Sequence, residues 1–298
     1  IPTGPEHLPQ LLRLCPGGLQ VLSLLRRKDG QRLLLPELRQ ACTAGSKVLS
    51  GLWDTDKQMT AGKRIGDYTV DTKLGSGRYG VCFLARDSHG EKVVLKRFRR
   101  RLFQKNPPGS HHEAVILSGL DHPSIPELLG VVHEREGYFF VLKYMPGHTL
   151  RQLLFREHHI FTEEDIFRIG AQLSEALVYI HSRSVVHGDL SISNIVDDGH
   201  RTGLLDFGLA RYRGEDGAAY DLDYACLGNV LLYLLYSGWH GRRCGAWYDE
   251  LDLSADKELF LRRLLRLDRG FTHTEQMRDA FLAAFSPHTE TYTDKSKG

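Results

Sequence analysis

From residue 65 the chain contains segments in which apolar and polar positions alternate at the spacing of β-strands. Glycine-rich turns separate three strand-like runs, at residues 68–74, 81–86 and 92–98. A short helical pattern follows in SHHEAVILSGL, residues 110–120, and an extended run, GYFFVLKYM, covers residues 137–145. Period-two alternation bounded by turn residues is typical of half-buried strands. The pattern predicts a small, β-rich lobe that contains one helix.

From Thr162 onward the apolar positions recur at helical spacing. Thr162 precedes three acids, which is typical of a helix N-cap and first turn. The apolar stripe behind it consists of Ile166, Ile169, Leu173, Leu177 and Ile180. Residues 224–241 form the longest uncharged run, but its polar and glycine-rich end favours a buried core helix over a membrane span. A larger helical lobe is therefore expected after the β-rich lobe.

The first 64 residues are rich in leucine. Their two apolar patches, residues 8–27 and 32–53, are broken by Pro and Gly into short helical pieces, and no secretory hydrophobic region is visible. We expect this segment to pack against the lobes or a protein partner. The predicted fold class is α+β and bilobal. Its predicted parts are a helical extension (1–64), an N-lobe with hinge (65–146), a C-lobe (147–287) and a polar tail (288–298).

The amino-acid composition limits the classes of partner that we expect this chain to bind. The 298 residues carry 39 basic and 37 acidic side chains, so the net charge of +2 gives no reason to expect nucleic acid or a membrane surface as a partner. The five cysteines are scattered, odd in number and without CxxC spacing. This usage is typical of reduced thiols in the cytoplasm, and it favours neither a disulfide framework nor a zinc site.

Three glycines, Gly75, Gly77 and Gly80, stand in GSGRYGV between two predicted strands. Residues without a Cβ let backbone N–H groups approach phosphate oxygens. A plain hairpin turn is the alternative for this motif alone. The strand on its far side argues against a dinucleotide fold, in which the same spacing opens a helix.

A lysine and a glutamate are the next candidates. Lys96 ends the apolar strand KVVLK, and a buried ammonium group needs anionic partners. Glu113 is the only acid between Lys96 and Asp121. The alternative role of Glu113 is a capping box with Ser110. We favour a Lys96–Glu113 pair, because an unpaired strand lysine is the costlier arrangement.

Two acids and an asparagine follow in HGDLSISNIV and LLDFGLA. Asp189 suits a base that accepts a hydroxyl proton and orients the nucleophile. Asn194 and Asp206 supply hard oxygen ligands that suit Mg²⁺. Each acid alone is explained by a turn. The order of these features along the chain is nevertheless the one that phosphoryl transfer on the protein-kinase scaffold requires: the glycine loop, the strand lysine, the helix glutamate and then these three residues.

Residues 66–285 accordingly resemble the protein kinase family. The resemblance implies ATP and Mg²⁺ as cofactors and a hydroxyl of a protein Ser/Thr as acceptor. It implies an adenine pocket with Val81 and Leu142, and a hinge at LKYM, residues 142–145. The nucleotide-binding residues expected from it are Gly75, Ser76, Gly77, Gly80, Val81, Lys96, Leu142, Lys143, Tyr144 and Met145. The expected catalytic residues are Lys96, Glu113, Asp189, Asn194 and Asp206, of which Asn194 and Asp206 are the metal ligands.

The C-terminal half of the chain matches the kinase pattern at some positions and departs from it at others. Residues 220–238 resemble the buried F helix of kinases, with Asp223 as its buried acid, and residues 260–281 resemble the closing helices. Most regulated kinases, however, have Arg where this chain has Gly188, and the usual Lys two positions after Asp189 is Ser191. Only 16 positions lie between Asp206 and Asp223, without Ala-Pro-Glu. We expect an enzyme that is not switched by phosphorylation of this segment.

Two function classes remain open. A compact Ser/Thr protein kinase is favoured, with a small-molecule phosphotransferase as a variant that the short segment permits. A non-catalytic binding module on a kinase fold is disfavoured, because Lys96, Asp189, Asn194 and Asp206 are all present.

Overall fold

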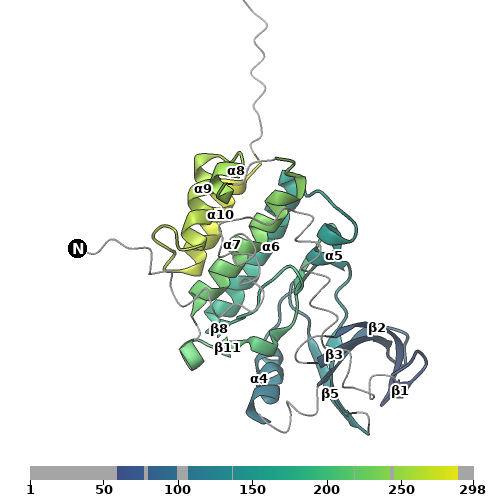
Figure 1. Cartoon of the computed structure of the whole chain (residues 1–298). Helices are drawn as coiled ribbons and strands as arrows, with labels where there is room; N and C mark the ends of the chain where they lie inside the picture. Colours follow the sequence, from purple (N-terminus) through teal and green to yellow (C-terminus); the bar gives the residue numbers. More distant parts are fainter. Residues whose placement is uncertain are drawn as a thin grey trace, which may run out of the picture.

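The computed structural model describes residues 59–76, 80–98, 107–135, 137–217, 219–241 and 245–287. Within these ranges the chain forms a small lobe rich in strands and a larger helical lobe (Figure 1). The predicted α+β, bilobal fold is present. The two leucine-rich patches of the predicted extension and the tail 288–298 lie outside the described residues.

The small lobe is built on an antiparallel sheet with the strand order β1-β2-β3-β4-β6-β5. Its strands are β1 (Arg64–Ile65), β2 (Tyr68–Ser76), β3 (Gly80–Arg86), β4 (Lys92–Phe98), β5 (Leu128–Glu134) and β6 (Gly137–Lys143). The three strand-like runs of the sequence are thus confirmed. A Cβ added to Gly66 would stand 3.3 Å from Val132, so the turn after β1 meets β5 and the sheet curls on itself.

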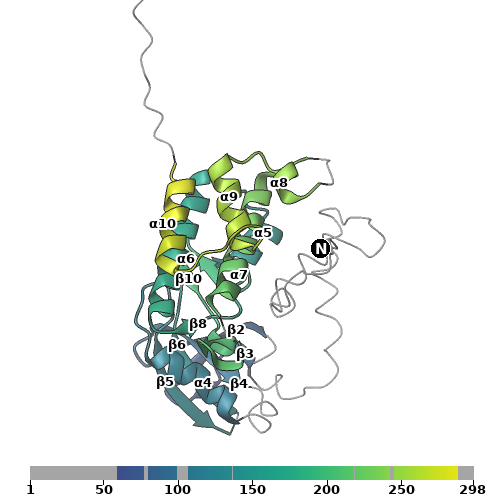
Figure 2. The same ribbon diagram turned by 90° about the vertical axis from the view of Figure 1, so that its left-hand side faces the viewer.

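One face of this sheet packs into the small-lobe core, and the other faces the helical lobe. Val93 and Leu95 of β4 are buried in the small-lobe core. Because side chains alternate along a strand, Val94 and Lys96 lie on the opposite face, toward the interlobe space. Helix α4 (Pro107–Ser118) covers part of that second face, as Figure 2 shows.

The small lobe begins earlier than predicted. Met59 is buried in the same core as Ile65. The Val70 N–H donates to the Lys63 carbonyl at 2.9 Å, and the Gly62 N–H donates to the Val70 carbonyl at 2.8 Å. Residues 59–64, which the predicted boundary assigned to the extension, are therefore part of the small lobe.

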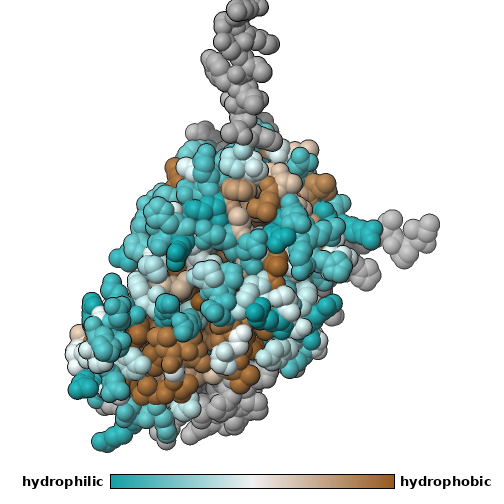
Figure 3. Space-filling model, turned by 180° about the vertical axis from the view of Figure 1, so that it is seen from behind, coloured by the Kyte–Doolittle hydropathy of each residue, from teal (hydrophilic) through white to brown (hydrophobic). Residues whose placement is uncertain are grey.

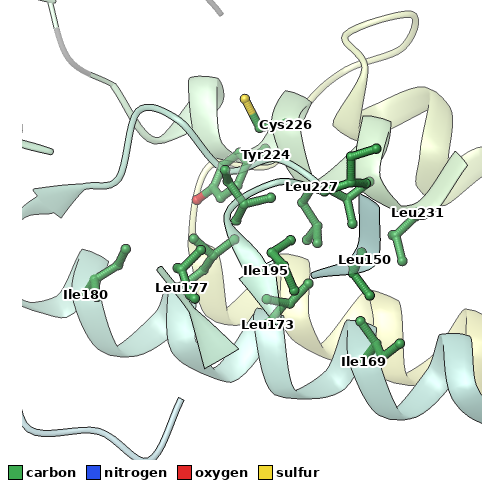
Figure 4. Packing of buried hydrophobic residues seen from close by; sticks show 14 of the residues in the cluster. Leu150, Ile169, Leu173, Leu177, Ile180, Ile195, Tyr224, Cys226, Leu227 and Leu231 are labelled. Atoms are coloured by element: carbon green, nitrogen blue, oxygen red, sulfur yellow. The ribbon is translucent and has the colours of Figure 1, made fainter. Parts of the chain in front are cut away.

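The helical lobe is organised around α6 (Glu163–Ser182). Thr162 caps it as predicted: its Oγ1 accepts from the Asp165 N–H at 3.1 Å, and the Asp165 side chain accepts from the Thr162 N–H at 3.2 Å. The predicted stripe from Ile166 to Ile180 is buried, and Figure 4 shows its residues Ile169, Leu173, Leu177 and Ile180 in the core. The other helices are α5 (Leu150–Phe155), α7 (Tyr220–Leu235), α8 (Trp247–Glu250), α9 (Ala255–Leu264) and α10 (Thr274–Phe285).

Two of these helices pack closely on α6. Leu227 and Leu231 of α7 are completely buried, which confirms the prediction of a buried core helix. Helix α10 approaches so near that a Cβ on Gly170 would overlap the Phe281 ring at 2.2 Å. None of the helices in the described part of the chain is long and apolar enough to cross a membrane.

Within the described residues, the helical lobe also contains five short strands on the side that faces the small lobe. They are β7 (His148–Thr149), β8 (Val185–Val186), β9 (Ile195–Asp197), β10 (Thr202–Leu204) and β11 (Arg211–Tyr212). β9 pairs with β7 and β10, and β8 pairs with β11. The loops between β8 and β9 and between β10 and β11 carry the polar residues singled out in the sequence.

Candidate active site

A cavity of about 1030 Å³ lies between the lobes. From the small lobe it is lined by the ends of β2 and β3 and by Lys96 of β4. The segment that joins the lobes, residues 142–145, forms one wall. Asn194 and Asp206 line it from the helical lobe. Polar groups from distant parts of the chain therefore line one cavity, which is open on one side.

Lys96 joins both lobes at the inner end of this cavity. Its Nζ donates to Glu113 Oε1 at 2.5 Å and to Asp206 Oδ1 at 2.7 Å. The Lys96 and Glu113 side chains are 5% and 1% exposed. Burial alone would lower the pKa of Lys96, but the two carboxylates raise it above its ordinary value. The ammonium group therefore stays charged and fixed in place.

The predicted pair of Lys96 and Glu113 is present. Helix α4 begins at Pro107, so Ser110 lies within its first turn and not at the N-cap that a capping box requires. The second oxygen of Glu113, Oε2, is buried and has no hydrogen-bond partner within the described part of the chain. Burial raises the pKa of Glu113, and Lys96 opposes this.

Asp206 has an uncommon backbone conformation. Its φ of 61° and ψ of 77° lie in the left-handed region, which costs energy for a residue with a Cβ. The Gly208 N–H donates to Asp206 Oδ1 at 3.2 Å and helps to hold this conformation. Burial would raise the pKa of Asp206, but Lys96 and this hydrogen bond lower it. The carboxylate is thus kept ionised at the cavity wall.

Asp189 and Asn194 form a second pair. The Asn194 Nδ2 donates to the Asp189 carbonyl at 2.9 Å and to its Oδ2 at 3.0 Å. The amide oxygen of Asn194 takes no part in these bonds and suits a hard cation. Burial raises the pKa of Asp189, against the opposing effect of His187, and nearby Asp206 raises it further. A raised pKa makes Asp189 a better proton acceptor.

Asp223 of α7 supports the loop that carries Asp189. It is completely buried, as predicted, and its oxygens accept from the N–H groups of His187 at 2.7 Å and Gly188 at 2.8 Å. The His187 ring bridges onward, with its Nε2 3.0 Å from the Leu205 carbonyl beside Asp206. The loops of Asp189 and Asp206 are therefore fixed to one another through His187.

Most predicted nucleotide-binding residues line the cavity: Gly75, Ser76, Gly80, Lys96, Leu142, Lys143, Tyr144 and Met145. Gly77 lies outside the described residues. The assignment of Val81 to the adenine pocket needs correction, because Val81 is buried in the small-lobe core and its neighbour Cys82 lines the cavity. The two residues are adjacent on β3, so they point to opposite faces.

Two residues of this region were not found from the sequence. The Cys82 position could have been inferred by aligning β3 with β4, since Cys82 lies opposite Lys96 in the sheet and must share its face. His187 was visible only as part of the HGD motif. Its bridging role depends on a tertiary contact that no local pattern encodes.

The chain belongs to the protein kinase family. The profile of the family described as "Protein kinase domain" matches residues 68–225. The chain is 31% identical over 222 residues to "Probable serine/threonine-protein kinase YbdM" of Bacillus subtilis, across 71% of this chain and 87% of that protein. The resemblance inferred from the motifs and the prediction of a protein kinase are confirmed.

Larger proteins are also similar over their kinase-like part. "Probable serine/threonine-protein kinase KIN1 homolog" of Enterocytozoon bieneusi is 33% identical over 157 residues, which is 52% of this chain and 26% of that protein. Smooth muscle myosin light chain kinase of Gallus gallus is 30% identical over 153 residues, 50% of this chain and 8% of that protein. The chain thus spans most of YbdM and about a quarter or less of these two.

Proposed function

We propose that this protein transfers the γ-phosphoryl group of ATP to a Ser/Thr hydroxyl of a protein substrate in the presence of Mg²⁺. The observation that carries the proposal is the convergence of Lys96, Asn194 and Asp206 on one interlobe cavity, with Asp189 bonded to Asn194. The relatives named above as serine/threonine-protein kinases support the class of acceptor.

The residues fit this cofactor. Glycines 75 and 80 at the small-lobe wall leave room for phosphate oxygens near backbone N–H groups. Asn194 and Asp206 offer the amide and carboxylate oxygens that Mg²⁺ prefers. When bound, the ion neutralises charge that develops on the transferred group. Lys96 is already charged and aimed at the same space, where it would hold the phosphates.

Asp189 is the proposed base. In the transfer, the acceptor oxygen forms a bond to the γ-phosphorus, the bond from phosphorus to the bridging oxygen breaks, and ADP leaves. The hydroxyl proton passes to the Asp189 carboxylate. Asn194 holds that carboxylate through Nδ2, so that Asp189 is oriented as well as basic.

The test is incubation with labelled ATP and Mg²⁺, first with protein mixtures and then with small alcohols and amines. We expect label in protein Ser/Thr, and a loss of roughly 10²- to 10⁴-fold in rate for Asp189→Ala with little change in nucleotide affinity, as for removal of a positioned base. Label only in small molecules would instead support a small-molecule phosphotransferase. No transfer to any acceptor, with ATP still bound, would support a binding module.

We extend the proposal to the N-terminal segment. On the reverse face a hydrophobic area lies over the small lobe (Figure 3). In the same lobe, α4 and β5 carry the exposed apolar residues Val115, Leu129 and Val131. The described chain starts at buried Met59, within this lobe. We propose that the leucine-rich segment covers this area or binds a protein partner. Deletion of residues 1–58 should then lower the melting temperature or solubility, and a variant unchanged in both would contradict the packing.

The prediction of a cytoplasmic location is retained as part of the proposal. The five cysteines are scattered along the sequence without CxxC spacing, which fits a reducing compartment. We also propose that activity does not depend on phosphorylation of the segment after Asp206.

A further inference from the structure

Gly203 is a buried glycine directly behind the wall of the interlobe cavity. It is the middle residue of β10, and in the antiparallel pairing of β10 with β9 it stands opposite Val196. Val196 lines the cavity, and so does Met145 at the end of the segment that joins the lobes. The immediate surroundings of Gly203 therefore include two residues of the cavity wall.

The space that a side chain at position 203 would need is already filled. A Cβ added to Gly203 would stand 2.7 Å from Met145 Cε and 2.9 Å from Val196 Cγ2. Carbon atoms of packed side chains lie about 3.5–4.0 Å apart, so both atoms would have to move. The φ of Gly203 lies outside the left-handed region. Packing, and not backbone conformation, is therefore the reason for glycine at this position.

Strand β9 is held in place on its other sides. Val196 pairs with Thr149 of β7 on the edge opposite β10. The carboxylate of Asp197 accepts from Arg168 Nη1 at 2.6 Å and Nη2 at 2.9 Å, and from the Thr202 hydroxyl at 3.0 Å. The backbone of β9 is thus fixed by strands on both edges and by an ion pair to α6. It cannot retreat easily from a side chain on β10.

Met145 is the neighbour that gives way most easily. Its side chain is unbranched and has three rotatable bonds, whereas Val196 is branched at Cβ and stiff. The space beside Met145 that protein atoms do not fill is the cavity itself. A side chain at position 203 would therefore turn the end of Met145 into the volume proposed for the nucleotide.

We propose that Gly203 is a positioning residue for nucleotide binding: because it has no side chain, Met145 can lie against β10 and stay out of the cavity. The inference rests on the proposed function, since it places ATP in this cavity. The role of Gly203 differs from that of the loop glycines Gly75 and Gly80, which are proposed to approach the phosphates directly. Gly203 acts only through Met145.

The first experiment measures ADP affinity and the kinetics of phosphoryl transfer for Gly203→Ala. The variant should bind ADP about tenfold more weakly, as expected for overpacking of a filled site. The KM for ATP should rise, and kcat at saturating ATP should stay within about twofold, which is the signature of lost binding. Gly203→Val should weaken ADP binding further.

Two glycines provide matched controls. A Cβ added to Gly130 in β5 would meet no atom within 4 Å, so Gly130→Ala should change neither stability nor ADP affinity. A Cβ on Gly228 in α7 would stand 3.0 Å from Leu265 Cδ2, in the packing of α7 against α9. Gly228→Ala should lower the melting temperature and leave ADP affinity unchanged. A loss of affinity as large as that of Gly203→Ala would mean general instability and would overturn the inference.

The second experiment follows Met145 directly by NMR of methionine methyl groups. The chain contains three methionines, Met59, Met145 and Met277, so three signals are expected, and Met145→Leu assigns the one of interest. Gly203→Ala should shift the Met145 signal without added nucleotide. The signals of Met59 and Met277, which are buried in the cores of the two lobes, should stay in place. An unmoved Met145 signal would contradict the proposed role.

A double-mutant cycle tests whether Gly203 acts through Met145. In the Met145→Ala background the displaced atoms are missing, so the added change Gly203→Ala should weaken ADP binding by only about twofold or less. If Gly203→Ala alone does not fold, the double variant should still fold and bind ADP like Met145→Ala. Equal losses in both backgrounds, or a double variant that does not fold, would overturn the inference while the kinase function stands. Failure of the intact chain to bind ADP or ATP would contradict the proposed function itself.

Discussion

Two buried charged clusters of this protein differ in how completely their polar atoms are paired. The aspartate cluster, Asp223 with His181 and the loop at residues 187–188, uses both carboxylate oxygens: Oδ2 accepts from His181 Nε2 at 3.0 Å and from the His187 N–H, and Oδ1 accepts from the Gly188 N–H. The lysine cluster, Lys96 with Glu113 and Asp206, leaves Glu113 Oε2 without a partner within the described residues.

The two clusters also differ in contact with the cavity. The Asp223 side chain is 0% exposed, whereas 35% of the Asp206 side chain is exposed. A fully paired, fully buried acid serves the fold, because every substitution leaves donors without acceptors. A partly open cluster with spare charge can exchange one of its partners for a ligand. We therefore expect the aspartate cluster to stabilise the fold and the lysine cluster to take part in phosphoryl transfer.

The largest effect is expected for Asp206→Asn. The change removes the negative charge proposed to hold Mg²⁺ and should lower the phosphoryl-transfer rate by roughly 10³-fold or more, since the metal contributes several kcal/mol of charge stabilisation. Lys96 keeps Glu113 as a partner, so the melting temperature should change little. Transfer assays and thermal melting measure the two outcomes, and normal turnover with Mg²⁺ would refute the assignment.

Asp223→Ala should, in contrast to Asp206→Asn, lower the stability of the fold. It leaves the His187 and Gly188 N–H groups buried without acceptors, which should cost about 3–5 kcal/mol and lower the melting temperature by roughly 10 °C. Asp221→Ala on the same helix is the control, because Asp221 forms a partly exposed pair with Arg266 that is worth less than about 1 kcal/mol. Equal melting temperatures of the two variants would mean that Asp223 does not support the fold.

The pH dependence of stability follows from the same acid. Although burial acts to raise it, hydrogen bonding from His181 lowers the pKa of Asp223 below its ordinary value of 3.8. The stabilisation is therefore fully present above pH 4 and is lost as the pH falls through the lowered pKa. In acid unfolding, the intact chain should lose the stabilisation contributed by the Asp223 carboxylate as the pH falls. Asp223→Ala has no carboxylate there, so its free energy of unfolding should not show this contribution to the pH dependence.

Much of this arrangement could be predicted from local patterns, and the rest could not. The resemblance to the kinase F helix identified Asp223, and the absence of another acid near Lys96 identified Glu113. The face of β3 was misjudged at Val81, because register and not composition decides which neighbour points inward. The participation of His181 and the inclusion of Met59 in the small lobe depend on contacts between distant segments. Such contacts are set by tertiary packing, which no single stretch of sequence records.

Glu113→Gln should have an intermediate effect. The substitution keeps the size of the side chain but leaves Lys96 with Asp206 as its only carboxylate among the partners described above. Displacement of the ammonium by about 1 Å could reduce kcat/KM by roughly 10²-fold. Kinetics with varied ATP measure the effect, and Glu134→Gln at the exposed end of β5 is the control. Unchanged kinetics would show that the pair is structural.

The smallest effect, no change in activity, is expected from treatment with a broad phosphatase. Gly188 stands where regulated kinases have the phosphate-binding Arg. Its φ of 76° favours glycine there, and a Cβ added to it would stand 3.1 Å from the Leu209 carbonyl oxygen. Backbone hydrogen bonds hold the segment after Asp206 in place: β11 pairs with β8, and the Arg213 N–H donates to the Ser184 carbonyl at 2.7 Å.

The sequence of that segment gives the second reason. Residues 207–219 contain neither Ser nor Thr, and Tyr212 is the only hydroxyl residue in them. At the start of α7, the Tyr220 hydroxyl already donates to the His181 carbonyl at 2.7 Å. We therefore expect phosphatase-treated protein and Tyr212→Phe to match the untreated chain within about twofold in phosphoryl transfer. Loss of most activity on dephosphorylation, with Tyr212→Phe equally inactive, would show that Tyr212 is a controlling site and that the lysine cluster is not assembled without it.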